Sequence, residues 1–188
     1  LRSLGAKPQQ ERLFLRALVR GQALDLSAER GEARFPKALR AALPELAADW
    51  ATQAKVSSEH PGEDGSARLL IQLRDGQEVE SVLLPRDGVC VSTQVGCAVG
   101  CVFCMTGRSG LIRQLSSLEI LAQVALARQR RALRRVVFMG MGEPAHNLDA
   151  VMEAIELLGT EGLIGHKNLV FSTVGDLRVF DALPRGPV

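Results

Sequence analysis

The sequence has little net charge, few cysteines and no long apolar run, and each shortage excludes a class of protein. Its formal net charge of +2 over 188 residues excludes a polycation that binds nucleic acid over its whole surface. Four cysteines, three of them close together, do not form the pattern of a disulfide framework. No apolar run approaches the ~20 residues of a membrane-spanning helix, and Leu13–Val19, interrupted by Arg16, does not resemble a signal peptide. We therefore expect no membrane partner.

The positive charge is distributed unevenly along the chain. Between Arg108 and Arg135 there are seven arginines and a single acidic residue, Glu119, so this segment carries a net charge of +6. The rest of the chain is correspondingly acidic. A local basic stripe is typical of a surface that binds phosphate groups. The stripe is therefore a candidate RNA-binding surface, although the residues alone do not decide this.

The first third of the chain has the pattern of a small helical domain followed by a linker. Residues 1–56 carry apolar side chains at helical spacing, and Gly21 is expected to end the first helix because glycine accepts the left-handed conformation. Pro44 is expected to split a later helix, since proline lacks the backbone N–H that a helix needs. Residues 57–66 are polar and contain two glycines and a proline, so we predict a linker there.

Residues 67–188 combine a β-hairpin with alternating strands and helices. Two apolar, β-rich segments, 67–73 and 77–84, flank Asp75-Gly76, a dipeptide typical of hairpin turns. Ser116–Glu119 has the pattern of a capping box that begins a helix. Strand and helix patterns then alternate, with strands expected at 90–95, 136–139 and 169–173. Three such units predict a parallel sheet with right-handed crossovers.

Three cysteines, Cys97, Cys101 and Cys104, have three and then two residues between them. Thiolates bind soft metals and iron–sulfur clusters. Three close ligands suit a cluster that leaves one iron open for a small molecule, whereas a closed zinc site needs a fourth ligand. Two alternatives are a set of buried thiols and a zinc-holding RNA-binding module in which Cys90 supplies the fourth ligand.

This cysteine spacing, with Phe103 just before the last cysteine, resembles the radical S-adenosylmethionine (SAM) superfamily. Two further segments, Cys90–Cys97 and Gly140–Pro144, make the chain similar to the RNA methyltransferases that modify C2 of adenine in 23S rRNA and tRNA. The resemblance implies an α/β fold, the first half of a partial (βα)6 barrel, preceded by a small helical domain and a β-hairpin. It also implies two cofactors, a [4Fe–4S] cluster held by the three cysteines and SAM.

The resemblance further implies roles for single residues at the ends of the expected strands, where parallel α/β folds bind their ligands. Gly142, Glu143 and Ser172 would bind SAM; the alternative is that they form ordinary turns after strands. Glu80 would remove the C2 proton, and its alternative is a solvent-facing strand position. Cys90 would resolve a methyl-cysteine intermediate by forming a disulfide bond, and its alternative is a buried strand thiol.

The resemblance also sets the expected partners and compartment. No cysteine follows Cys104, so the methyl-carrying cysteine of the family is not in this chain. A cluster of this type needs a reducing compartment, and we expect a cytoplasmic protein with an electron donor such as flavodoxin. The expected substrate is 23S rRNA, with tRNA as a further one. A relative that methylates C8 of adenine, or another radical SAM enzyme, is an open alternative.

Overall fold

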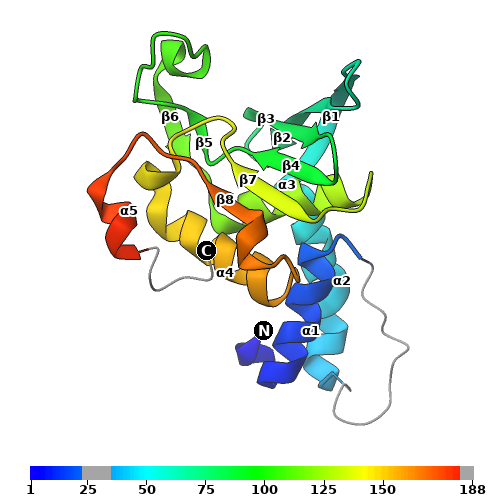
Figure 1. Ribbon diagram of the computed structural model, residues 1–188. Coiled ribbons are helices and arrows are strands. Elements are labelled where there is room, and N and C mark those ends of the chain that lie inside the picture. Colours follow the sequence, from blue (N-terminus) through cyan, green and yellow to red (C-terminus); the bar gives the residue numbers. More distant parts are fainter. Residues whose placement is uncertain (23–34, 183–188) are drawn as a thin grey trace.

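The computed structural model describes residues 1–22 and 35–182 (Figure 1). Its strands are β1 (Ala54–Pro61), β2 (Ala67–Leu73), β3 (Glu78–Leu84), β4 (Gly88–Val91), β5 (Gln94–Gly96), β6 (Leu111–Gln114), β7 (Arg135–Phe138) and β8 (Leu169–Phe171). Its α-helices are α1 (Pro8–Val19), α2 (Lys37–Gln53), α3 (Ser117–Arg128), α4 (Leu148–Thr160) and α5 (Leu177–Ala182). Short 3-10 helices are η1 (Arg2–Leu4), η3 (Thr106–Ser109), η4 (Pro144–Asn147) and η5 (His166–Asn168).

Six strands form the main sheet in the order β1-β2-β3-β4-β7-β8. The first four are antiparallel to their neighbours, and β4, β7 and β8 are parallel. The carboxyl ends of these parallel strands therefore lie at one edge of the sheet, where ligands bind in parallel α/β folds. A separate hairpin of β5 and β6 stands away from this sheet, at the upper left of Figure 1. The α/β fold expected from the sequence is confirmed.

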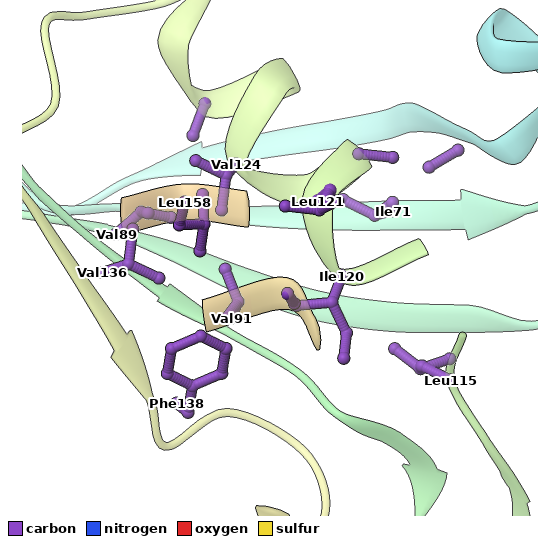
Figure 2. Close-up of a cluster of buried hydrophobic side chains, with 14 of the residues drawn as sticks. Ile71, Val89, Val91, Leu115, Ile120, Leu121, Val124, Val136, Phe138 and Leu158 are labelled. Carbon is purple, nitrogen blue, oxygen red and sulfur yellow. The ribbon is translucent and has the colours of Figure 1, made fainter. Parts of the chain in front are cut away.

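The main core lies between the sheet and the helices α3 and α4. Figure 2 shows Ile120, Leu121 and Val124 of α3 among the strand side chains Val91 and Phe138. All five are at most 1% exposed. Burying side chains of this size contributes about 1.5–3 kcal/mol each, so the core holds the parallel strands and their carboxyl ends in fixed positions.

A second, smaller core joins the two N-terminal helices. Phe14 of α1 packs with Phe35, Leu39 and Leu43, separately from the main core. The helix α2 continues across Pro44, so the expected split is wrong. Leu39 and Leu43 bury the turn before the proline, and this packing outweighs the loss of one backbone hydrogen bond.

Gly21 ends α1 as expected. It has a φ of 64°, and its N–H donates to the carbonyl of Leu18 at 3.0 Å. A Cβ at this position would stand 2.7 Å from the carbonyl oxygen of Ala125 on α3. Glycine is therefore needed here for two reasons, the left-handed backbone and the close approach of the two helices.

The predicted linker at residues 57–66 is wrong in its first half. Residues up to Pro61 belong to β1, which pairs with β2, and only the rest form the turn between these strands. The segment reads as polar because β1 is an edge strand with mostly exposed side chains, and edge strands often carry polar residues. The division into domains at this point stays a prediction.

The hairpin and the capping box are confirmed. Asp75 and Gly76 lie between β2 and β3, with Gly76 at a φ of 84°. The Ser116 hydroxyl accepts from the Glu119 N–H at 3.2 Å, and the Glu119 carboxylate accepts from the Ser116 N–H at 2.8 Å. Helix α3 begins at the residue after Ser116.

The strand expected at 90–95 is instead divided between two sheets. Strand β4 ends at Val91, and β5 begins at Gln94 and pairs with β6. Between them, the Ser92 N–H donates to the Gln123 side chain at 2.8 Å, and the Thr93 N–H donates to the Met141 carbonyl at 2.8 Å. These bonds direct the chain out of the main sheet. The mixture of apolar and polar residues in segment 90–95 does not indicate this change of sheet.

Helix α1 is held against the rest of the protein by charged side chains. Arg16 pairs with Glu161 at 3.1 Å, and the partly buried Arg128 guanidinium donates to the carbonyls of Val19 and Gly162 at 3.0 and 2.7 Å. Burial lowers the pKa of Arg128 from its ordinary value.

No helix in the described part of the chain has both the length and the apolar character that crossing a membrane requires.

Candidate active site

Three segments that contain candidate site residues border one groove. It has a volume of about 570 Å³ and is lined by Glu80 of β3, by Met141 of the loop after β7, and by Gly96, Met105 and Thr106 around the cysteine loop. These residues are far apart in the sequence and come from strand β3 and the loop after β7 of the main sheet and from the separate β5–β6 hairpin. The groove is the candidate active site.

Glu80 lies on the open face of the sheet, opposite the face that α3 covers. Its strand neighbours Val79 and Ser81 are buried, and Glu80 itself is 42% exposed at the side chain. Its carboxylate accepts from Arg68 Nη1 at 3.1 Å. A half-exposed carboxylate at the wall of a groove can reach a bound molecule, which is the geometry that a general base needs.

Cys90 lies on the same face of the sheet, one strand further along. It is opposite Val82 of β3 and Val137 of β7 and is 7% exposed. Burial raises the pKa of the Cys90 thiol, and a backbone hydrogen bond with Met139 opposes this shift without cancelling it. The thiol is therefore held in its protonated form at neutral pH.

The three clustered cysteines lie on the loop between β5 and β6. Cys97 is buried, whereas Cys101 and Cys104 are partly exposed, and all four cysteines of the chain are free. The loop is anchored by the Cys97 N–H, which donates to the Gly110 carbonyl at 3.0 Å. Within residues 1–22 and 35–182, no three His, Cys, Asp or Glu side chains are grouped closely enough to hold a metal ion. The loop thus carries three free thiols whose sulfurs are not gathered, and its residues Met105 and Thr106 line the groove.

The loop after β7 approaches the cysteine hairpin very closely. Gly142 has a φ of 98°, and a Cβ there would stand 2.6 Å from the side chain of Gln94. Glu143 is 4% exposed. Its carboxylate accepts from the N–H groups of Ala145 and Val174, both at 2.9 Å. Glu143 therefore joins the loop after β7 to the loop after β8.

Ser172 begins that second loop, directly after β8. It is partly buried, and its N–H donates to the Phe138 carbonyl at 3.4 Å. The structure thus brings Gly142, Glu143 and Ser172 to the same edge of the parallel sheet, as the strand pattern predicts. Their role in binding SAM stays a prediction.

Two buried residues between β4 and β5 connect these parts, and the sequence reasoning gave neither a role. The Ser92 hydroxyl donates to the Glu80 carbonyl and accepts from the Met141 N–H at 2.8 Å. The Gln94 side chain accepts from the Glu143 N–H at 2.8 Å. Polar residues directly after a strand and before the cysteines are the signal that could have identified them.

The basic stripe is largely bonded inside the protein. Arg130 pairs with Glu59 at 2.8 Å, and the partly buried Arg128 donates to backbone carbonyls. Other members of the stripe that bond within the described part of the chain are Arg113, to Asp75 and Glu119, and Arg131, to the carbonyls of Gly65 and Leu84. These four arginines of the stripe already have partners within the protein, and the RNA-binding role of the stripe stays a prediction.

The fold and the site together define the class of this protein: an α/β protein with free thiols and with a glycine-rich loop at the carboxyl edge of its parallel strands. Thiols are the ligands that iron–sulfur clusters use, and this edge is where such folds bind small molecules.

Comparisons with known proteins identify the family. The profile of the Radical SAM superfamily matches residues 91–185, and the chain belongs to this superfamily. A solved radical SAM methyltransferase from Sphaerobacter thermophilus is 37% identical, with a TM-score of 0.79 over 100% of this chain and 57% of that chain. The α/β fold is therefore the first part of a partial radical SAM barrel.

Curated relatives are still more similar in sequence. A probable RNA methyltransferase of Thiobacillus denitrificans is 69% identical over the whole chain, which covers 52% of that protein. The probable RNA methyltransferase PA1839 of Pseudomonas aeruginosa is 65% identical over 98% of the chain and 54% of that protein. The chain thus spans about half the length of the curated relatives it matches.

Radical SAM methyltransferases use a [4Fe–4S] cluster and SAM, and the residues of this chain fit both. Three free thiols on one loop are the donor set that a cluster with one open iron requires. Gly140 and Gly142 make the loop after β7 narrow: a Cβ at Gly140 would stand 2.7 Å from the Val91 carbonyl oxygen. Gly140 itself is exposed, so a ligand can approach its peptide groups.

Proposed function

We propose that this chain forms the front half of a radical SAM RNA methyltransferase that transfers a methyl group to C2 of adenine in 23S rRNA, with tRNA as a further substrate. The observation that carries the proposal is the groove, because Glu80, the cysteine loop and the loop next to Gly142 all border it. The names of the relatives, probable RNA methyltransferase, support the choice of RNA.

Cys97, Cys101 and Cys104 would hold the cluster, and Gly142, Glu143 and Ser172 would bind SAM. When bound, the cluster and SAM supply the one-electron chemistry that an electron-poor carbon such as adenine C2 requires. An electron donor such as flavodoxin would reduce the enzyme, in the reducing cytoplasm.

Glu80 would accept the proton that leaves C2. Its carboxylate lines the groove and accepts a hydrogen bond from the neighbouring Arg68 guanidinium at 3.1 Å. Removal of a general base lowers the rate by ~10²–10⁴-fold. We therefore expect Glu80→Gln to reduce methylation by about this factor, whereas Glu63→Gln, in the exposed turn between β1 and β2, has no effect.

Cys90 would resolve a methyl-cysteine intermediate. Its thiol would attack the sulfur of the methyl-carrying cysteine, which lies outside this chain, so that a disulfide forms and the product is released. Burial holds the Cys90 proton, so this attack requires that the proton be removed first. The Cys90→Ala variant of the full-length protein should keep its cluster and accumulate a covalent protein–RNA adduct.

The proposal is tested by nucleoside mass spectrometry of RNA treated with the full-length protein, SAM and a reductant under anaerobic conditions. The expected product is 2-methyladenosine. A product of 8-methyladenosine would assign the chain to the C8-methylating relatives. Metal analysis tests the class itself: about four irons and four sulfides per chain support the cluster, whereas one zinc and no iron support the RNA-binding module.

A further inference from the structure

We infer that Gln94 is a positioning residue that fixes the SAM-binding loop after β7 relative to the cysteine loop. The inference rests on the proposed function, because it takes the loop around Gly142 as the site of SAM. It adds a residue that contacts two predicted SAM ligands, Gly142 and Glu143, and lies three residues before the predicted cluster ligand Cys97.

Both polar atoms of the Gln94 side-chain amide form hydrogen bonds. Its Oε1 accepts from the Glu143 N–H at 2.8 Å, and its Nε2 donates to Oε1 of Gln114 at 2.8 Å. Gln94 is fully buried. An amide with an acceptor at one end and a donor at the other can satisfy both partners in one orientation only, so its direction is fixed.

The second bond leads into a longer chain of amides. Gln114 is the partner of Gln94 across the β5–β6 pair, and its Nε2 donates to the His146 carbonyl at 2.9 Å. His146 belongs to η4, which begins directly after Glu143. The hairpin that bears the cysteine loop is therefore bonded to the start and to the end of the same short segment, 143–146.

Gln94 also packs directly on the loop that it bonds. The Gly142 backbone approaches so closely that a Cβ would stand 2.6 Å from Cβ and Cγ of Gln94. The backbone N–H of Gln94 donates to the Met141 carbonyl at 3.2 Å. Cys97 lies three residues further along from Gln94, so a shift of this loop changes its distance from the first cysteine.

The effect of losing the amide follows from these contacts. Leucine is similar to glutamine in size but makes no hydrogen bond, so Gln94→Leu leaves the Glu143 N–H and the Gln114 Oε1 without the partner that Gln94 supplies. Buried polar groups without partners are unfavourable, and the loop is expected to move to satisfy them. The bonds of the Glu143 carboxylate and of the Thr93 N–H stay in place, so the fold itself should persist.

The test measures SAM binding in the full-length protein after anaerobic reconstitution. Gln94→Leu should keep about four irons per chain and bind SAM about tenfold more weakly, a factor that corresponds to ~1.4 kcal/mol. The electron paramagnetic resonance signal of the reduced cluster should change less on addition of SAM than in the unmodified protein. Gln94→Glu, which keeps the acceptor for Glu143, should restore most of the affinity. Gln72→Leu on β2 is the matched control.

Each result decides the inference. Unchanged SAM affinity and an unchanged resonance signal in Gln94→Leu would overturn it, as would a loss of iron, since Gln94 would then support the cysteine loop instead. Should Gln94→Leu fail to fold, Gln114→Leu is the second test: it removes the bonds of Gln114 to Gln94 and to the His146 carbonyl but keeps the bond between Gln94 and the Glu143 N–H. It must weaken SAM binding in the same direction, and an unchanged affinity refutes the inference. If the unmodified protein binds neither iron nor SAM, the proposed function fails as well.

Discussion

Glu161 offers a sharp test of how helix α1 is attached. It is the residue at which α4 ends, and its side chain is only 6% exposed. A carboxylate at the carboxyl end of a helix is unfavourable because it meets the negative end of the helix dipole. Two arginines of α1 offset this cost: Arg16 at 3.1 Å and Arg12 at 3.7 Å. We therefore predict that Glu161→Gln loosens α1.

The size of the effect follows from the geometry. At an effective dielectric constant of ~20, two charges as close as those of Arg16 and Glu161 attract by about 5 kcal/mol. Arg16 is 40% exposed and Arg12 is 72% exposed at the side chain, so solvent removes most of this. A charged hydrogen bond contributes ~1.5–3 kcal/mol when buried. We expect Glu161→Gln to cost about 1–2 kcal/mol, or about 3–6 °C in Tm.

The assay is thermal and urea unfolding of the single variants Glu161→Gln and Arg16→Met and of the double variant. The coupling free energy between the two sites should be about 1 kcal/mol and should decrease in high salt. Glu11→Gln is the control, since Glu11 pairs at 3.0 Å with Arg2, whose side chain is 84% exposed; such pairs contribute ~0–1 kcal/mol. A coupling free energy below ~0.3 kcal/mol would refute the reasoning.

Three further predictions follow from single contacts. The Arg113 hydrogen bond lowers the pKa of Asp75 below 3.8; its stabilisation is therefore present above this value and lost as the pH falls below it, so in acid titrations of unfolding the difference between the unmodified protein and Asp75→Asn should vanish. Burial and a raised pKa should make Cys90 unreactive to iodoacetamide at pH 8 in the folded, cluster-loaded protein, and mass spectrometry should find it alkylated only after unfolding. Gly142→Ala should weaken SAM binding more than Gly65→Ala does, because both have positive φ but only Gly142 faces a side chain within 4 Å; equal effects would show that backbone strain alone matters.

Short sequence patterns correctly predicted the elements whose structure depends on residues close together in the sequence. The turn at Asp75-Gly76 needs only a glycine at positive φ between two β-rich segments. The start of α3 needs only Ser116 and Glu119 at the correct spacing, since each satisfies the backbone N–H of the other. These predictions succeeded because the residues that stabilise each feature lie within a few positions of one another.

The errors arose where distant residues decide the structure. Pro44 stays inside a helix because Leu39 and Leu43 are buried against Phe14, a contact from another helix. The chain leaves the main sheet after Val91 because of bonds to Gln123 and Met141. No pattern within a short window contains such contacts, so propensity was outweighed by packing and hydrogen bonding at long range.

The arginine stripe shows the same limit for function. Its composition predicts a phosphate-binding surface, yet composition cannot tell a free arginine from one that is already paired. Arg128 donates to two backbone carbonyls, and Arg130 pairs with Glu59, which is 71 positions away in the sequence. The composition therefore does not decide whether the stripe binds RNA, and that role stays a prediction.

The two acidic residues that the sequence singled out differ in what they can do. Glu143 is buried, and each of its carboxylate oxygens already accepts a backbone N–H, so that the carboxylate joins two loops. Glu80 has a single charged partner, Arg68, and a side chain that is 42% exposed at the groove. A general base must gain and lose a proton in every turnover without disturbing the fold. This difference supports Glu80, rather than Glu143, as the proposed base, and Glu143 stays a predicted SAM-binding residue.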